Sequence, residues 1–109
     1  FNAIVNATQL VAGSVGAAFV VPSGIAIQNC RSSKLGDSFC SDGYHLESTY
    51  VRYTSACVWL EKLFGISAIG SGYKPDTVTP FQAKIAQYAA HYAVRNPTVI
   101  TSLENRKDE

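Results

Sequence analysis

The sequence predicts an α/β fold that is mostly helical and contains at least one buried parallel strand. Residues 18–21 form a continuous apolar run, which is typical of a parallel strand covered on both faces. Apolar residues recur at helical spacing before and after this run. The 109 residues, 47% of them hydrophobic, suffice for one small globular domain.

The first two elements follow from the apolar pattern. The opening helix has one face made of Ile4, Val5, Thr8 and Val11. Gly13 or Gly16 then ends it. After the strand, Ser23 stands at the carboxyl end, the edge where ligands bind in open α/β sheets. We therefore expect Ser23 to contact a ligand or to cap the next helix.

A short helix over residues 24–29 and a long loop over residues 30–46 come next. A loop of this length is uncommon in a compact domain and is more often functional. Three polar residues follow the carboxyl edge of the strand, namely Gln28, Asn29 and Arg31. They are candidate substrate-binding residues, and a solvated loop is the alternative for each.

Two longer helices fill the second half of the chain. The first starts near Ser48 or Thr49, either of which can cap it, and stops at Gly65. We interpret Trp59 as core or rim packing rather than as a platform for a sugar. The apolar face of this helix comprises Tyr53, Ala56, Cys57, Leu60, Leu63 and Phe64.

The last helix has the clearest start signal. Thr79 at the N-cap, Pro80 at the first helical position and Gln82 two residues later complete a capping box. Asn96 and Pro97 end the helix. Its buried stripe is predicted at Phe81, Ile85, Ala89 and Tyr92. The charged residues 104–109 form a tail, so that one domain covers residues 1–103.

The uncharged opening of the chain indicates missing sequence. No charged residue precedes Arg31, and the downstream part is too small to bury such an opening on several sides. We therefore expect further sequence upstream of Phe1, which would also carry any signal peptide. Residues 1–109 therefore do not indicate the cellular compartment. A secreted or periplasmic protein is one interpretation. The apolar run is too short to span a membrane.

Charge and cysteine content exclude several partners. The net charge of +1 is spread evenly after Arg31, which gives no basic stripe for nucleic acid and no polybasic patch for a membrane. With two histidines and no zinc-type cysteine spacing, no metal and no cofactor are expected. Cys57 fits a small core residue. Cys30 and Cys40 flank a polar loop. A disulfide between them is one alternative if the compartment is oxidising.

Asp42 and His45 form the most informative pattern of the chain. The carboxylate stands three residues before the histidine, directly ahead of a helix. In a tight turn, Asp42 can accept a hydrogen bond from Nδ1–H of His45, which leaves Nε2 to take a proton from a nucleophile. The same pattern also fits an Asp that caps the helix beside a histidine satisfied by backbone groups.

The residues around this pattern resemble the C-terminal block of the SGNH (GDSL-type) hydrolase superfamily. More narrowly, they are similar to a branch catalogued as a domain of unknown function. The resemblance is carried by Asp42-Gly43-Tyr44-His45-Leu46, Arg52-Tyr53, Ala56-Cys57-Val58-Trp59-Leu60-Glu61, Gly24-Ile25-Ala26-Ile27-Gln28-Asn29-Cys30-Arg31 and Gly72-Tyr73-Lys74-Pro75.

The resemblance implies the C-terminal part of a three-layer α/β/α, flavodoxin-like sandwich. Asp42 and His45 match the catalytic Asp and His of that superfamily, whose members hydrolyse esters. Implied substrates are small acyl esters, with acetyl groups on polysaccharides or lipid esters as examples. The family's nucleophilic Ser and its oxyanion-hole Gly and Asn lie in earlier blocks, which residues 1–109 do not contain.

Two further motifs have simpler interpretations. Gly36-Asp37-Ser38-Phe39 spells the family's nucleophile block, but the polar residues 31–35 before it cannot form the buried strand that the block requires. Ser38 is therefore interpreted as part of a polar turn in a surface loop. His91 lies mid-helix with no acid three or four positions away, which favours a packing or surface role.

Three functions of different classes remain. The first, which we adopt, is the catalytic C-terminal segment of a serine ester hydrolase, with Asp42 and His45 in its triad. The second is a carbohydrate- or ligand-binding module in which these side chains hold a polar ligand. The third is a structural domain. Residues 1–109 alone are predicted to be inactive, because the nucleophile and oxyanion hole are missing.

Overall fold

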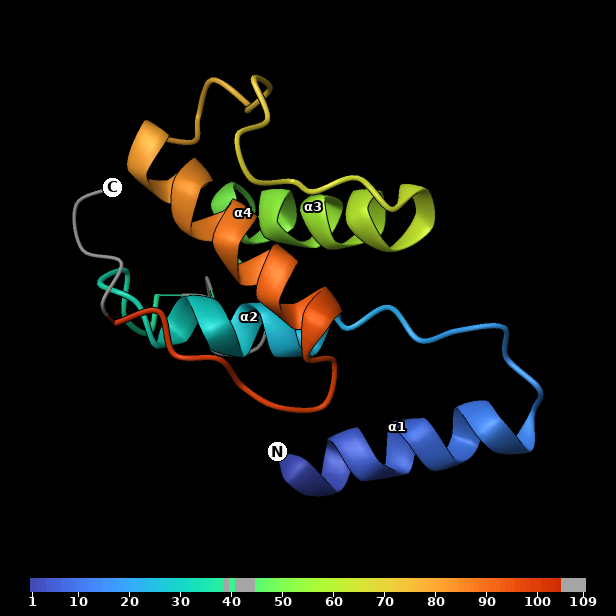
Figure 1. Ribbon diagram of the computed structural model, residues 1–109. Helices are drawn as coiled ribbons and strands as arrows, with labels where there is room; N and C mark the ends of the chain where they lie inside the picture. The colour runs from blue at the N-terminus through green and yellow to red at the C-terminus, as the bar shows by residue number, and fades with distance from the viewer. Residues whose placement is uncertain (39, 41–44, 105–109) are drawn as a thin grey trace.

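The computed structural model describes residues 1–38, 40 and 45–104. α2, α3 and α4 pack against one another, and α1 lies apart from them (Figure 1). Each predicted helix is confirmed, with its ends within a few residues of those expected. The helices in the described part of the chain are α1 (Asn2–Ser14), α2 (Ser23–Arg31), α3 (Tyr50–Phe64) and α4 (Pro80–Arg95).

The strand predicted over residues 18–21 is wrong for this structure. Residues 17–22 form no regular element, and no strand is present among the described residues. A strand exists only beside a hydrogen-bonded neighbour, and the surrounding helices supply none. Phe19 is 47% exposed, so the apolar run is not covered on both faces. The described residues therefore show a mostly helical arrangement, rather than the expected α/β one.

The opening helix is also less buried than its composition suggests. None of the residues of α1 is buried, and Leu10 is 73% exposed. Val5 packs against the edge of the core. None of the helices in the described part of the chain is long and apolar enough to cross a membrane.

The hydrophobic core lies where α2, α3 and α4 meet. The side of α4 that faces the core is rich in alanine, which lets the neighbouring helices approach closely. Ile85 from α4 and Val51 and Val58 from α3 fill the centre, with at most 2% of their surfaces exposed. Leu103, beyond α4, is 1% exposed and closes the core. The buried alanines of α4 are Ala83, Ala86, Ala89, Ala90 and Ala93.

The buried face of α3 differs from the prediction in its second half. Tyr53 and Cys57 are buried as expected, but Trp59 is 50% exposed and does not belong to the core. The predicted face residues Ala56, Leu60, Leu63 and Phe64 are exposed as well. The buried face turns instead through Tyr50, Val51, Tyr53, Thr54, Cys57, Val58 and Glu61.

The predicted start of α4 is confirmed. The backbone N–H of Gln82 donates to Oγ1 of Thr79 at 3.1 Å, and the side-chain Oε1 of Gln82 accepts from the Thr79 N–H at 2.9 Å. Asn96 ends the helix, as expected. Of the predicted stripe, Ile85 and Ala89 are buried, and Phe81 and Tyr92 pack against the core while partly exposed.

The three cysteines are free thiols. Cys30 turns into the core, where its Sγ lies 3.6 Å from Oγ1 of Thr54, and Cys40 is exposed. The Cys30–Cys40 disulfide that the sequence left open is therefore absent. Burial raises the pKa of Cys30 to about 12 and that of Cys57 to about 11, so both stay protonated at neutral pH.

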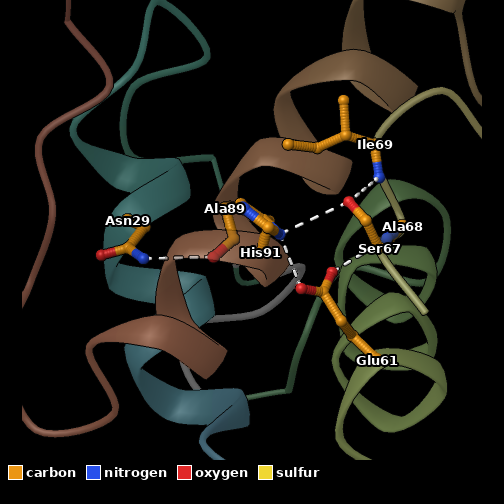
Figure 2. A network of polar contacts seen from close by, with 7 residues as sticks. All are labelled: Asn29, Glu61, Ser67, Ala68, Ile69, Ala89 and His91. Carbon is orange, nitrogen blue, oxygen red and sulfur yellow. Dashed lines mark hydrogen bonds and ion pairs between the residues drawn. The ribbon is translucent and has the colours of Figure 1, made fainter. Parts of the chain in front are cut away.

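One buried amide ties α2 to the rest of the core. Nδ2 of Asn29 donates to the carbonyl of Ala89 in α4 at 3.1 Å, as Figure 2 shows. Its Oδ1 accepts from the backbone N–H of Thr101 at 2.7 Å. Ser32 Oγ accepts from the N–H of Leu103 at 2.7 Å, two residues further along the same segment. Through these bonds α2 holds both α4 and the chain that follows it.

We predict that Asn29→Ala destabilises the protein by about 2–3 kcal/mol, because the N–H of Thr101 loses its acceptor and a cavity forms where the fully buried side chain was. The free energy of unfolding in urea measures this. Gln9→Ala, at an exposed position of α1, is the control and is expected to change it by less than about 0.5 kcal/mol. An equal effect of the two substitutions would show that the Asn29 bonds carry no stability.

Candidate functional site

His45 lies exposed near the end of the long segment between α2 and α3. Leu46, directly after it, forms an isolated antiparallel bridge with Cys40. Asp42, the predicted partner of His45, lies outside the described residues. The proposed hydrogen bond between Asp42 and His45 therefore stays a prediction, and the structure adds the surroundings of His45 alone.

The start of α3, just after His45, is held by Glu47. Its Oε1 accepts from the backbone N–H and from Oγ1 of Thr49 at 2.8 and 2.5 Å, and its Oε2 accepts from the N–H of Val51 at 3.3 Å. Thr49 occupies the N-cap position but makes no capping bond with its own side chain. The sequence prediction named Ser48 or Thr49 as the cap, and the carboxylate of Glu47 takes that role instead.

The hydrogen bonds also set the pKa of Glu47. Partial burial raises it, but the bonds from the Thr49 side chain and from the backbone N–H groups of the first turn outweigh this, so that the pKa lies below its ordinary value of 4.5. The carboxylate is therefore charged at neutral pH at the positive end of the helix dipole. The Glu47 bonds therefore hold the chain at the residue that directly follows Leu46.

A groove of about 270 Å³ opens beside this segment and is bordered by Leu46 and Cys40. Its other wall comes from α2, with Ile27, Gln28 and Arg31. Two of the predicted substrate-binding residues, Gln28 and Arg31, are thus brought next to the chain that carries His45. Neither the resemblance nor the residue spacing could show that they share this groove with Leu46.

The polar end of the groove is an array of three side chains. Arg31 donates from Nη1 to Oε1 of Gln28 at 3.0 Å and from Nη2 to Oδ2 of Asp37 at 2.9 Å. The Arg31 and Asp37 side chains are 42% and 72% exposed, so their ion pair adds little stability. It does fix the direction of the guanidinium, whose remaining N–H groups can donate to a ligand.

The other two predicted binding residues have different surroundings. Ser23 is half-buried at the first position of α2, and its backbone N–H donates to the carbonyl of Val21 at 2.9 Å. Asn29 is fully buried, and its amide is used by Ala89 and Thr101. Ligand contacts by these two residues remain predictions without a groove contact to support them.

Ser38 is bonded within its own loop and to α3. Its hydroxyl donates to the carbonyl of Leu35 at 3.2 Å and shares a short hydrogen bond with the hydroxyl of Tyr50. The Tyr50 hydroxyl also donates to the carbonyl of Ser38 at 3.0 Å. These contacts indicate that Ser38 is a structural residue of the turn. Burial raises the pKa of Tyr50, so its hydroxyl stays protonated and able to donate.

The structure brings together an acid–histidine pair that the sequence did not reveal. Nδ1 of His91 lies 2.6 Å from Oε1 of Glu61 and 3.4 Å from Oγ of Ser67, as Figure 2 shows. Oε2 of Glu61 accepts from the N–H of Ala68 at 2.9 Å. The Glu61 and His91 side chains are 7% and 20% exposed. Their positions are 30 residues apart, so no local spacing could indicate the pair.

The geometry of this pair is that of a structural link between helices, rather than that of a catalytic relay. A relay needs the acid at one imidazole nitrogen and the nucleophile at the other. Here both Glu61 and Ser67 contact Nδ1 of His91. The pair instead joins α3 to α4 and, through the Ala68 N–H, holds the loop after α3. His91 therefore has a packing role, as the sequence favoured, with an acidic partner that it did not foresee.

No metal centre is evident among the described residues. No group of three or more His, Cys, Asp or Glu side chains gathers there.

Comparison with known proteins links the chain to one family. The family model described as "Domain of unknown function (DUF4886)" matches residues 1–93. A crystal structure of a DUF4886 family protein from Bacteroides uniformis is similar, with a TM-score of 0.90 and 43% sequence identity. The match covers 94% of this chain and 39% of that one, so the chain spans well under half of the solved protein. No curated protein matches the chain.

We predict that the stabilising effect of Glu47 depends on pH. Because its folded pKa is lowered, its contribution is fully present above the unfolded pKa, near 4.5, and is lost as the pH falls through the folded value. Glu47→Gln should cost about 1 kcal/mol of unfolding free energy at neutral pH. The difference from the wild type should vanish in strong acid, where Glu47 is also neutral.

Urea unfolding of the wild type and Glu47→Gln at several pH values measures this difference. Glu104→Gln, at an exposed position beyond α4, is the matched control and should show no such dependence. A Glu47 difference that stays constant down to strong acid would contradict the charged cap.

Proposed function

The chain belongs to the DUF4886 family, and we propose that it supplies the acid–base pair of a serine ester hydrolase of the SGNH type. In this proposal His45 is the general base and then the general acid, and Asp42 orients it. The observation that carries the proposal is the exposed His45 on a segment that borders the groove of Gln28 and Arg31.

The surroundings of His45 suit a positioned base. The Cys40–Leu46 bridge precedes α3, and the Glu47 cap fixes the first turn of that helix, so the chain on the C-terminal side of His45 is held in place. A catalytic side chain needs such support, because a small misplacement lowers the rate steeply. His45 is exposed, and its neighbour Leu46 lines the groove.

The mechanism follows from these roles. Nε2 of His45 would remove the proton of a Ser hydroxyl as this oxygen attacks the ester carbonyl, and would then give the proton to the leaving alcohol. Water activated by the same nitrogen would release the acyl group. Asp42 would hold Nδ1–H and stabilise the imidazolium that forms in between.

The nucleophile and the oxyanion donors are proposed to come from residues outside this chain's 109. The match to 39% of the related crystal structure supports this division. Ser38 is a poor nucleophile candidate, because its hydroxyl is bonded to Leu35 and Tyr50 within a surface loop. The exposed apolar face of α1 and the uncovered Phe19 would then pack against the accompanying sequence.

The groove favours an ester that has both apolar and polar parts. Ile27 and Leu46 offer apolar contacts, and Gln28, Arg31 and Asp37 offer donors and acceptors at one end. The polar array could hold hydroxyl groups, which fits the acetylated carbohydrate that the family resemblance implies. A module that binds such a ligand without chemistry is the second candidate, since the same array would serve it.

We predict that His45→Ala in the intact protein lowers hydrolysis of p-nitrophenyl acetate at least about 1,000-fold. The melting temperature should change by less than about 2 °C, because an exposed side chain contributes little packing. His91→Ala is the matched control: it breaks the hydrogen bond with Glu61 and should lower the melting temperature while the folded fraction keeps its activity.

Unchanged turnover by a well-folded His45→Ala variant would end the hydrolase proposal. An intact protein that binds acetylated sugars but hydrolyses no ester would favour the binding module. Residues 1–109 alone should show no turnover. Turnover by this chain that Ser38→Ala abolishes would instead make Ser38 the nucleophile and overturn the division of the site.

A further inference from the structure

A second groove lies between the loop after α3 and the first half of α4. Ile69, Pro80 and Ala83 form its apolar walls, and Lys74 and Lys84 stand among its lining residues. None of these residues borders the groove beside His45. Its volume of about 340 Å³ falls in the range of small-molecule sites.

The loop wall of this groove is held by a buried amide, so the groove is already formed without a ligand. Gln87 of α4 is 7% exposed, and its Oε1 accepts from the N–H of Gly70 at 3.0 Å. Its Nε2 donates to the carbonyl of Ser71 at 3.3 Å and to the hydroxyl of Tyr53 at 3.0 Å. A preformed wall lowers the entropy cost of binding.

The same loop is tied to α3 on its other side. The Tyr53 hydroxyl donates to the carbonyl of Tyr73 at 2.7 Å. Burial raises the pKa of Tyr53, so the hydroxyl keeps the proton that this bond requires. Gly70 has a φ of 83°, which favours glycine, and the turn toward Ser71 depends on it.

The charges around the groove are unbalanced. Nζ of Lys74 donates to the carbonyl of Val78 at 2.7 Å, which uses one of its three N–H groups. Within residues 1–38, 40 and 45–104, no carboxylate pairs with Lys74 or with Lys84. Both N–H groups of the Gln87 amide are already used. The two lysines are therefore the charged donors that line the groove, and their positive charge favours an anionic ligand.

We propose that this groove binds a small carboxylate with an apolar body. The carboxylate would lie between Lys74 and Lys84, and the body would pack on Ile69, Pro80 and Ala83. The apolar walls favour such a molecule over inorganic phosphate, which has no apolar part and would leave the walls uncovered. The site is independent of the hydrolase proposal, because it shares no residue with the groove beside His45.

Titration of the intact protein with benzoate, followed in ¹H–¹⁵N NMR spectra, tests the site. Benzoate should shift the amide signals of Gly70, Ser71 and Gly72, and benzyl alcohol, its uncharged analogue, should bind about tenfold more weakly. Lys84→Gln should weaken benzoate binding about fivefold. Arg52→Gln, which removes an exposed cation of α3 outside the groove, is the matched control and should leave it unchanged.

Several results would overturn the site. These are equal binding of benzyl alcohol and benzoate, tighter binding of inorganic phosphate, an equal effect of Lys84→Gln and Arg52→Gln, or no shift at residues 70–72. The amide spectrum of each variant shows directly whether it is folded. The measurement does not depend on ester hydrolysis, so its failure and that of the hydrolase proposal are distinguishable.

Discussion

The position of α2 depends on one buried amide, that of Asn29. It joins α2 to α4 through Ala89 and to the segment after α4 through Thr101. A buried amide requires its partners, since each unsatisfied group costs about 1–3 kcal/mol. The helix is therefore fixed in rotation as well as in place. As a result its other side presents Gln28 and Arg31 to the groove next to the His45 segment.

Polar side chains also join the helices to the connections between them. Glu47 bonds the first turn of α3, Glu61 bonds the N–H of Ala68, and Gln87 bonds Gly70 and Ser71. The core itself is built from small residues of α4 and branched ones of α3, which leave little polar surface for a ligand. Both proposed sites accordingly lie where a helix meets a connection held in this way.

Local signals predicted most of this arrangement. The capping box at Thr79 and the left-handed Gly65 depend on neighbours in sequence, so the ends of α4 and α3 followed from the sequence. Residues 18–21 could not be judged in this way, because a strand needs a partner outside its own segment. Leu60, Leu63 and Phe64 were wrongly assigned to the buried face for a similar reason: helical spacing gives a face but does not show what covers it.

The candidate site was likewise predictable only where local sequence indicated it. His45 stood out through its local pattern, and Gln28 and Arg31 through their place after the apolar run. The Glu61–His91 pair and the role of Asn29 were missed, since their partners lie 30 to 72 residues away in sequence. The signals that the sequence offered were a polar side chain at a helix position and the expected burial of that position. Neither signal identifies the partner residue.

The state of the His45 imidazole tests the central claim most directly. Long-range ¹H–¹⁵N NMR spectra of the intact protein, at a pH where the ring is neutral, show which nitrogen carries the proton. Our account predicts the Nδ1–H tautomer, held by Asp42, and its loss in Asp42→Asn. A ring protonated on Nε2 that Asp42→Asn leaves unchanged would contradict the account.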